Sequence, residues 1–133
     1  MKALKNTCII DDDPLFVFGM KILIKQLGNF GDLMICENGE EAIECLSELI
    51  DTKKDLPNVI FLDINMPIMD GWEFLEGFQK IPFEARKNVA IYIVSSSIDS
   101  RDLERTKKID LVNGYILKPI TPEDLSSVLE EVA

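Results

Sequence analysis

The chain has 133 residues and a mass of 15.1 kDa, enough for one domain with its own core and too few for two. Its 14 lysines and arginines face 24 aspartates and glutamates, so the net charge of −10 disfavours direct binding to nucleic acid or to an anionic membrane surface. The absence of histidine excludes a Ser-His-Asp or Cys-His catalytic system, an imidazole-ligated metal and a phosphohistidine carried on this chain.

Neither a membrane anchor nor an export signal is predicted. No apolar run approaches the roughly 20 residues needed to cross a bilayer, and the apolar stretch near the N-terminus is too short for a secretory signal. The three cysteines are an odd number without Cys-x-x-Cys spacing, as expected of reduced thiols. We therefore expect a cytoplasmic protein.

The first half of the chain alternates short apolar segments with helical patterns. A strand is predicted over 7–10, and Asp13, a good N-cap residue, begins a helix over 14–27. A second strand follows over 33–36 and a second helix over 39–50.

The second half of the chain continues this alternation. Its expected elements are, in order, a strand over 59–62, a helix over 72–78, a strand over 89–94, a helix over 100–109, a strand over 115–117 and a helix over 122–132.

Five strands alternating with five helices predict an α/β fold. The third and fourth strands are almost wholly apolar, which is typical of strands buried on both faces of a parallel sheet. Helices must then cover both sides, giving a three-layer, doubly wound domain with a five-stranded parallel sheet. In such sheets the functional site lies beyond the carboxyl ends of the strands.

The residues at these strand ends predict a site for phosphoryl transfer. Asp11, Asp12 and Asp63 follow the first and third strands, and clustered carboxylates suit Mg²⁺, with Mn²⁺ as a substitute. Lys118 offers a point charge for a phosphoryl oxygen and Ser95 a hydroxyl donor. Asp63 is the candidate nucleophile, which would become an aspartyl phosphate.

Taken together, these residues resemble the receiver domain of two-component response regulators, of the stand-alone, chemotaxis type, over about residues 5–132. Residues 9–14 are similar to the acidic-pair motif and residues 61–71 to the phosphorylation-site loop. Residues 93–96 resemble the Thr/Ser motif, and residues 114–119 the motif that joins an aromatic residue to a lysine. The resemblance implies a flavodoxin-like sheet with strand order 2-1-3-4-5.

The resemblance assigns a metal site to the acidic residues. It implies that Asp12 binds Mg²⁺ directly, that Asp11 assists through water, and that Asp63 is a ligand as well as the phosphoacceptor. It adds the backbone carbonyl of Asn65 to this set. Asn65 and Ser97 are also expected near the path of the water that hydrolyses the acyl phosphate.

The resemblance also assigns a switch. Ser95 is expected to shift toward the phosphoryl group and Tyr115 to follow it, while Lys118 pairs with a phosphoryl oxygen. The bond between Lys118 and Pro119 is expected to be cis. Ser at position 95 replaces the commoner Thr and lacks the methyl group that restricts its rotamer.

The implied function is a phosphorylation switch, not an enzyme acting on other molecules. The donor is expected to be a sensor histidine kinase or a histidine phosphotransfer protein, because the chain has no histidine. The output is expected to be contact with a downstream protein target. Residues 1–133 are interpreted as a single receiver domain without an output domain.

Two alternatives remain open. One is a receiver-like scaffold that binds partners without being phosphorylated. The other is a small phosphatase of the haloacid-dehalogenase type, but its Asp-x-Asp-x-Thr/Val pattern fails at the last position, and its second acidic pair could come only from Glu123 and Asp124.

Overall fold

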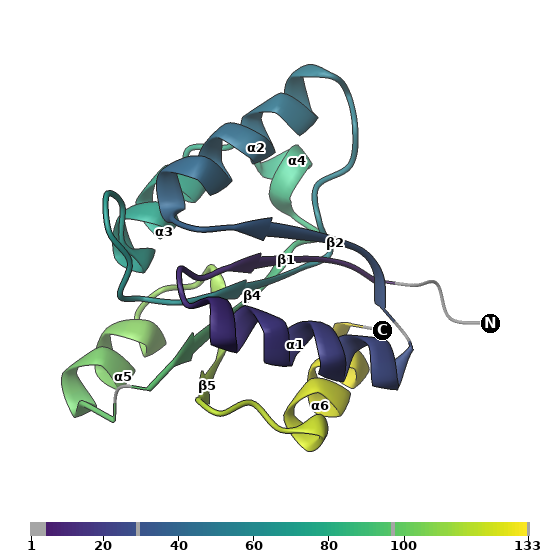
Figure 1. The fold of residues 1–133 in the computed structure, drawn as a ribbon. Coiled ribbons are helices and arrows are strands. Elements are labelled where there is room, and N and C mark those ends of the chain that lie inside the picture. Colours follow the sequence, from purple (N-terminus) through teal and green to yellow (C-terminus); the bar gives the residue numbers. More distant parts are fainter. Residues whose placement is uncertain (1–4, 29, 97, 133) are drawn as a thin grey trace.

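A computed structural model of the protein describes residues 5–28, 30–96 and 98–132. Its strands form one five-stranded parallel sheet, as the sequence predicts, in the order β2-β1-β3-β4-β5 that the resemblance implies (Figure 1). The strands are β1 (Lys5–Ile10), β2 (Phe30–Cys36), β3 (Val59–Leu62), β4 (Ala90–Ser95) and β5 (Val112–Leu117).

The described residues contain six helices, one more than the sequence predicts. They are α1 (Pro14–Leu27), α2 (Gly39–Asp51), α3 (Gly71–Gln79), α4 (Phe83–Arg86), α5 (Ser100–Lys107) and α6 (Pro122–Val132). The additional helix is α4, a single turn after Pro82 that Arg86 ties back by donating from Nε to the carbonyl of Ile81 at 2.9 Å.

Alternate residues of the central strands enter two separate apolar cores. On β3, Ile60 and Leu62 lie in the core beneath α2 and α3, whereas Val59 and Phe61 lie in the core beneath α1 and α6. Figure 1 shows these two helical layers on opposite sides of the sheet. Burial on both faces explains why the strand is apolar throughout. Within the described ranges, no helix has the length and apolar character that crossing a membrane requires.

The helices that lead away from the strand ends begin at side-chain caps. Asp13 accepts a hydrogen bond from the N–H of Leu15 at 3.0 Å at the start of α1, and Asn38 accepts one from Glu41 at the start of α2. Asp70 forms a reciprocal capping box at the start of α3. These caps fix where the chain turns from each strand into its helix.

Candidate functional site

Strand pairing brings Asp11, Asp63 and Lys118 together at the carboxyl edge of the sheet. Ile10 lies beside Leu62 in register, and the N–H of Asp63 donates to the carbonyl of Ile10 at 2.9 Å. On the other side, Lys118 follows β5 and its N–H donates to the carbonyl of Ser95 at 2.9 Å. Three segments distant in sequence thus form one site, as the sequence predicts.

Lys118 forms ion pairs with two of the buried carboxylates. Its Nζ lies 2.8 Å from Oδ2 of Asp11 and 3.8 Å from Oδ1 of Asp63. The other oxygen of Asp11 accepts a hydrogen bond from the N–H of Asp13 at 2.9 Å. Both oxygens of Asp11 are therefore engaged, and its side chain is held rigidly.

The carboxyl group of Asp63 has a raised pKa. The pKa is raised from its ordinary 3.8 to about 6, chiefly by burial and secondly by the negative charge of Asp11. The ammonium group of Lys118 and a hydrogen bond from the N–H of Asn65 act in the opposite direction without offsetting the burial, while Asp12 adds to the rise.

The acidic residues fit a divalent cation. Ligand oxygens of Asp11, Asp12 and Asp63 all lie within 4.8 Å of one another. Asp11 and Asp63 are buried, whereas Asp12 is exposed, so the cluster opens to solvent on one side. Carboxylate oxygens are the ligands that Mg²⁺ prefers, and a cation here would relieve the repulsion that raises the pKa of Asp63.

The other residues predicted for the site lie nearby. Asn65 is exposed two positions after Asp63, and its N–H reaches the Asp63 carboxylate. Ser95 is fully buried at the end of β4. Tyr115 lies beside Ile93 in the pairing of β4 with β5 and is half-buried.

Two further expectations concern the loops after β4 and β5. The peptide bond between Lys118 and Pro119 is cis, as expected. The expectation for Ser97 falls outside the residues that the structure describes.

The start of α3 packs directly against the backbone that follows β3. A Cβ atom on Gly71 would lie 2.6 Å from the carbonyl oxygen of Asp63, so only glycine fits there. The N–H of Gly71 donates to the carbonyl of Ile64 at 2.8 Å. In the loop between Ile64 and Gly71, Ile68 has a φ of +68°, which is a strained value for a β-branched residue. It lies in a tight turn in which the N–H of Met69 donates to the carbonyl of Pro67.

Sequence analysis missed two contacts between charged and aromatic side chains near the site. Nζ of Lys118 lies 4.3 Å from the ring centroid of Phe16 in α1. The guanidinium group of Arg105 in α5 lies 4.3 Å from the ring centroid of Trp72 in α3. No local sequence pattern indicates either pair, because each joins helices or loops that only the fold brings together.

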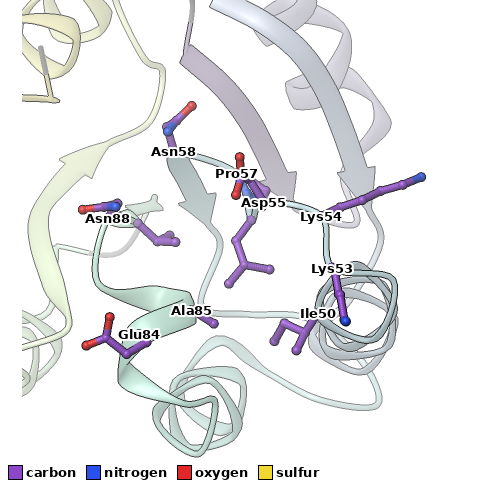
Figure 2. Close-up of a pocket in the computed structure, with 11 residues that line it drawn as sticks. Ile50, Lys53, Lys54, Asp55, Pro57, Asn58, Glu84, Ala85 and Asn88 are labelled. Atoms are coloured by element: carbon purple, nitrogen blue, oxygen red, sulfur yellow. The ribbon is translucent and has the colours of Figure 1, made fainter.

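A separate hollow lies at the opposite end of the sheet, where β3 and β4 begin (Figure 2). Its volume is about 380 Å³, and it lies between the end of α2 and the short helix α4. Lys53 stands on the α2 side and Glu84 on the α4 side (Figure 2). Because Asp63 follows the carboxyl end of β3, this hollow is not part of the acidic site.

The sheet order and the acidic edge define a flavodoxin-like, doubly wound domain whose site lies at the switch point between β1 and β3. More narrowly, the chain belongs to the response regulator receiver domain family, whose model matches residues 7–130. Members of this family are in general signalling switches, not enzymes, and they interact with histidine kinases or phosphotransfer proteins.

Two curated relatives and one solved structure illustrate the likeness. Chemotaxis protein CheY1 of Helicobacter pylori is 31% identical over 125 residues, covering 93% of this chain and 93% of the relative. The nitrate/nitrite response regulator protein NarL of Escherichia coli K12 is 34% identical over 94% of this chain and 53% of its own length. The chain thus spans about half of that relative. A two-component response regulator from Cytophaga hutchinsonii has a TM-score of 0.90 at 28% identity, covering 98% of both chains.

Proposed function

We propose that the protein is a phosphoacceptor switch in a two-component phosphorelay, in which Asp63 accepts a phosphoryl group from the phosphohistidine of a partner. The observation that carries this proposal is the buried carboxylate of Asp63, with the Lys118 ammonium group 3.8 Å from its oxygen and two further aspartates beside it. A nucleophile, a cation and a metal-binding carboxylate cluster are the parts that phosphoryl transfer needs.

In the proposed transfer, an oxygen of Asp63 attacks the phosphorus atom of the donor. A bond between oxygen and phosphorus forms while the bond between phosphorus and the histidine nitrogen breaks, and that nitrogen keeps the electron pair. Lys118 lies close enough to pair with a phosphoryl oxygen, and the Ser95 hydroxyl is the proposed donor to another. The donor histidine must lie outside these 133 residues, because they contain none.

Asp11, Asp12, Asp63 and the backbone carbonyl of Asn65 are the residues that would hold Mg²⁺. When bound, the ion supplies positive charge that neutralises the phosphoryl oxygens as transfer proceeds. The arrangement of three carboxylates within 4.8 Å supports this assignment.

The proposed output is a change in the face that α5, β5 and α6 form. Ser95 ends β4 and lies beside Leu117 of β5, and Tyr115 of β5 lies beside Ile93 of β4. A shift of Ser95 would therefore change the contacts that β4 makes with β5. Phosphorylation would favour one of two conformations through its contacts with Ser95, and a downstream protein would bind the altered face.

The decisive experiment is incubation of the protein with Mg²⁺ and acetyl phosphate or phosphoramidate, followed by intact-mass measurement. We expect a gain of one phosphoryl group in the wild type and none in Asp63→Asn. Asp55→Asn, which changes an exposed aspartate beside the distant hollow, should label as the wild type does.

The same measurement separates the alternatives. No labelling of the wild type by either donor, together with no binding of beryllofluoride, contradicts the proposal and favours an unphosphorylated binding scaffold. Continuous release of inorganic phosphate from phosphate esters, without a stable labelled chain, favours a phosphatase.

A further inference from the structure

The ammonium group of Lys118 touches three partners, and one of them is not an acid. It lies 2.8 Å from Asp11, 3.8 Å from Asp63 and 4.3 Å from the ring centroid of Phe16. Its side chain is 18% exposed, so water screens these contacts only in part. The negative face of an aromatic ring attracts a cation most strongly where water is excluded.

The ring of Phe16 is itself held in place by the start of α1. Asp13 caps this helix, and Val17, the next residue after Phe16, is buried in the core beneath α1 and α6. Phe16 is half-buried and packs against the same core. The ring is therefore a fixed surface, while the lysine chain that reaches it is long and flexible.

The three partners differ in what happens to them during the proposed reaction. Asp11 and Asp63 are both candidate metal ligands, and Asp63 changes its charge when it becomes an acyl phosphate. Phe16 keeps both its position and its electrostatic character throughout. It is the one contact of the Lys118 ammonium group recorded among the described residues that does not depend on the metal or the phosphoryl group.

We infer that Phe16 is a positioning residue for phosphoryl transfer: its ring holds the Lys118 ammonium group at the site when the carboxylates are engaged elsewhere. This inference rests on the proposed function and adds a residue to its machinery. The ring attracts the ammonium group without offering a hydrogen-bond acceptor. All three Lys118 donors therefore stay available to oxygen atoms, including those of the incoming phosphoryl group.

Two substitutions at Phe16 test this inference. Phe16→Leu keeps an apolar side chain and removes the ring, so we expect the rate of labelling by acetyl phosphate with Mg²⁺ to fall about threefold to tenfold. Phe16→Tyr keeps the ring and should restore a rate within about twofold of the wild type. Phe83→Leu is the matched control. Phe83 is exposed on the distant helix α4, and its ring centroid lies 5.5 Å from Cζ of Arg86, so this variant removes a ring from a similar pair outside the site.

A spectroscopic measurement on the metal-free protein tests the contact without any phosphoryl transfer. A group that lies over a ring face is shielded, so the side-chain methylene protons of Lys118 next to Nζ should resonate at higher field in wild type and Phe16→Tyr than in Phe16→Leu. Equal resonances in all three proteins contradict the contact. Equal loss of rate in Phe16→Leu and Phe16→Tyr, or in Phe83→Leu, assigns the effect to packing and overturns the inference.

The two proposals fail in different ways. If neither small donor labels the wild type and beryllofluoride does not bind, the proposed function fails, and with it the role of Phe16 in transfer, whatever the resonances show. If the wild type is labelled and Phe16→Leu is labelled equally fast, the proposed function stands and only the role of Phe16 is wrong.

Discussion

The buried carboxyl group of Asp63 lowers the stability of the fold when it is ionised. The side chain of Asp63 is 9% exposed and lies beside the charge of Asp11, and these surroundings raise its pKa to about 6. The pairing with Lys118 at 3.8 Å only partly offsets this cost. A residue kept for packing would be apolar here, so the buried acid is better explained by chemistry than by stability.

The raised pKa predicts how stability depends on pH. Because the pKa in the folded state exceeds the unfolded value, the stability that protonated Asp63 contributes is present below about pH 4 and is lost as the pH rises through about 6. Asp63→Asn removes this ionisation. With a chelator present to remove divalent ions, we expect the Asp63→Asn variant to be about 2 to 3 kcal/mol more stable than the wild type near pH 8. Near pH 4 the two free energies of unfolding should be nearly equal.

Urea unfolding followed by the fluorescence of Trp72, the single tryptophan, measures this difference. The difference between the two free energies of unfolding cancels the contribution of the other titrating groups, which both proteins share. A constant difference across this pH range would show that Asp63 titrates normally, contrary to its burial.

At the scale of elements, α1 offers an apolar surface beside the acidic site. Leu15, Phe18 and Ile22 are 82%, 63% and 43% exposed and lie at spacings of three and four, which gives one stripe along the helix. A hollow of about 380 Å³ borders this stripe and is lined by residues that include Asp12 and Phe18. A partner that presents a phosphohistidine to Asp63 would cover this surface.

We therefore expect Phe18→Ser to slow phosphoryl transfer from a protein donor at least about tenfold, and much more strongly than transfer from acetyl phosphate. The reason is that a small donor needs no docking surface, whereas a protein donor loses apolar contact area. Measuring both rates on each variant separates docking from chemistry.

Phe83→Ser is the matched control, because Phe83 is also exposed, at 62%, but lies on α4 at the other end of the sheet. If Phe18→Ser slowed transfer from both donors equally, Phe18 would act on the chemistry at the acidic site and not on docking. Slowing of the protein donor by Phe83→Ser would place the partner elsewhere.

At the scale of the whole molecule, the sheet and the acidic residues were predictable because each follows from a strong local signal. Continuous apolar strands require a parallel sheet covered on both faces, and such a sheet gathers its strand ends at one edge. The prediction that Asp11, Asp63 and Lys118 meet therefore needed no knowledge of side-chain packing, and the structure confirms it.

The features that sequence analysis missed depend on contacts between distant segments. Strand β5 begins at Val112, three residues earlier than predicted. The prediction began later because Asn113 and Gly114 are poor strand formers. The Asn113 side chain accepts a hydrogen bond from the N–H of Ile91 at 3.0 Å, which ties this stretch to β4. Helix α4 is too short for a periodic pattern, and the ring of Phe16 looks like ordinary core packing until Lys118 is located.

The cluster of Asp11, Asp12 and Asp63 is assembled from the ends of β1 and β3 and exists only in the folded chain, so Mg²⁺ bound there should stabilise the whole domain. At a concentration about a hundred times its dissociation constant, the ion should raise the free energy of unfolding by about 2.7 kcal/mol.

Urea unfolding with Mg²⁺ and with NaCl at matched ionic strength separates specific binding from charge screening in a chain with a net charge of −10. In Asp12→Asn, which alters an exposed ligand and leaves the core intact, the gain should fall to the level that NaCl produces. An equal gain in that variant would mean that Mg²⁺ binds elsewhere on this acidic protein, because the remaining site lacks one of its three carboxylates.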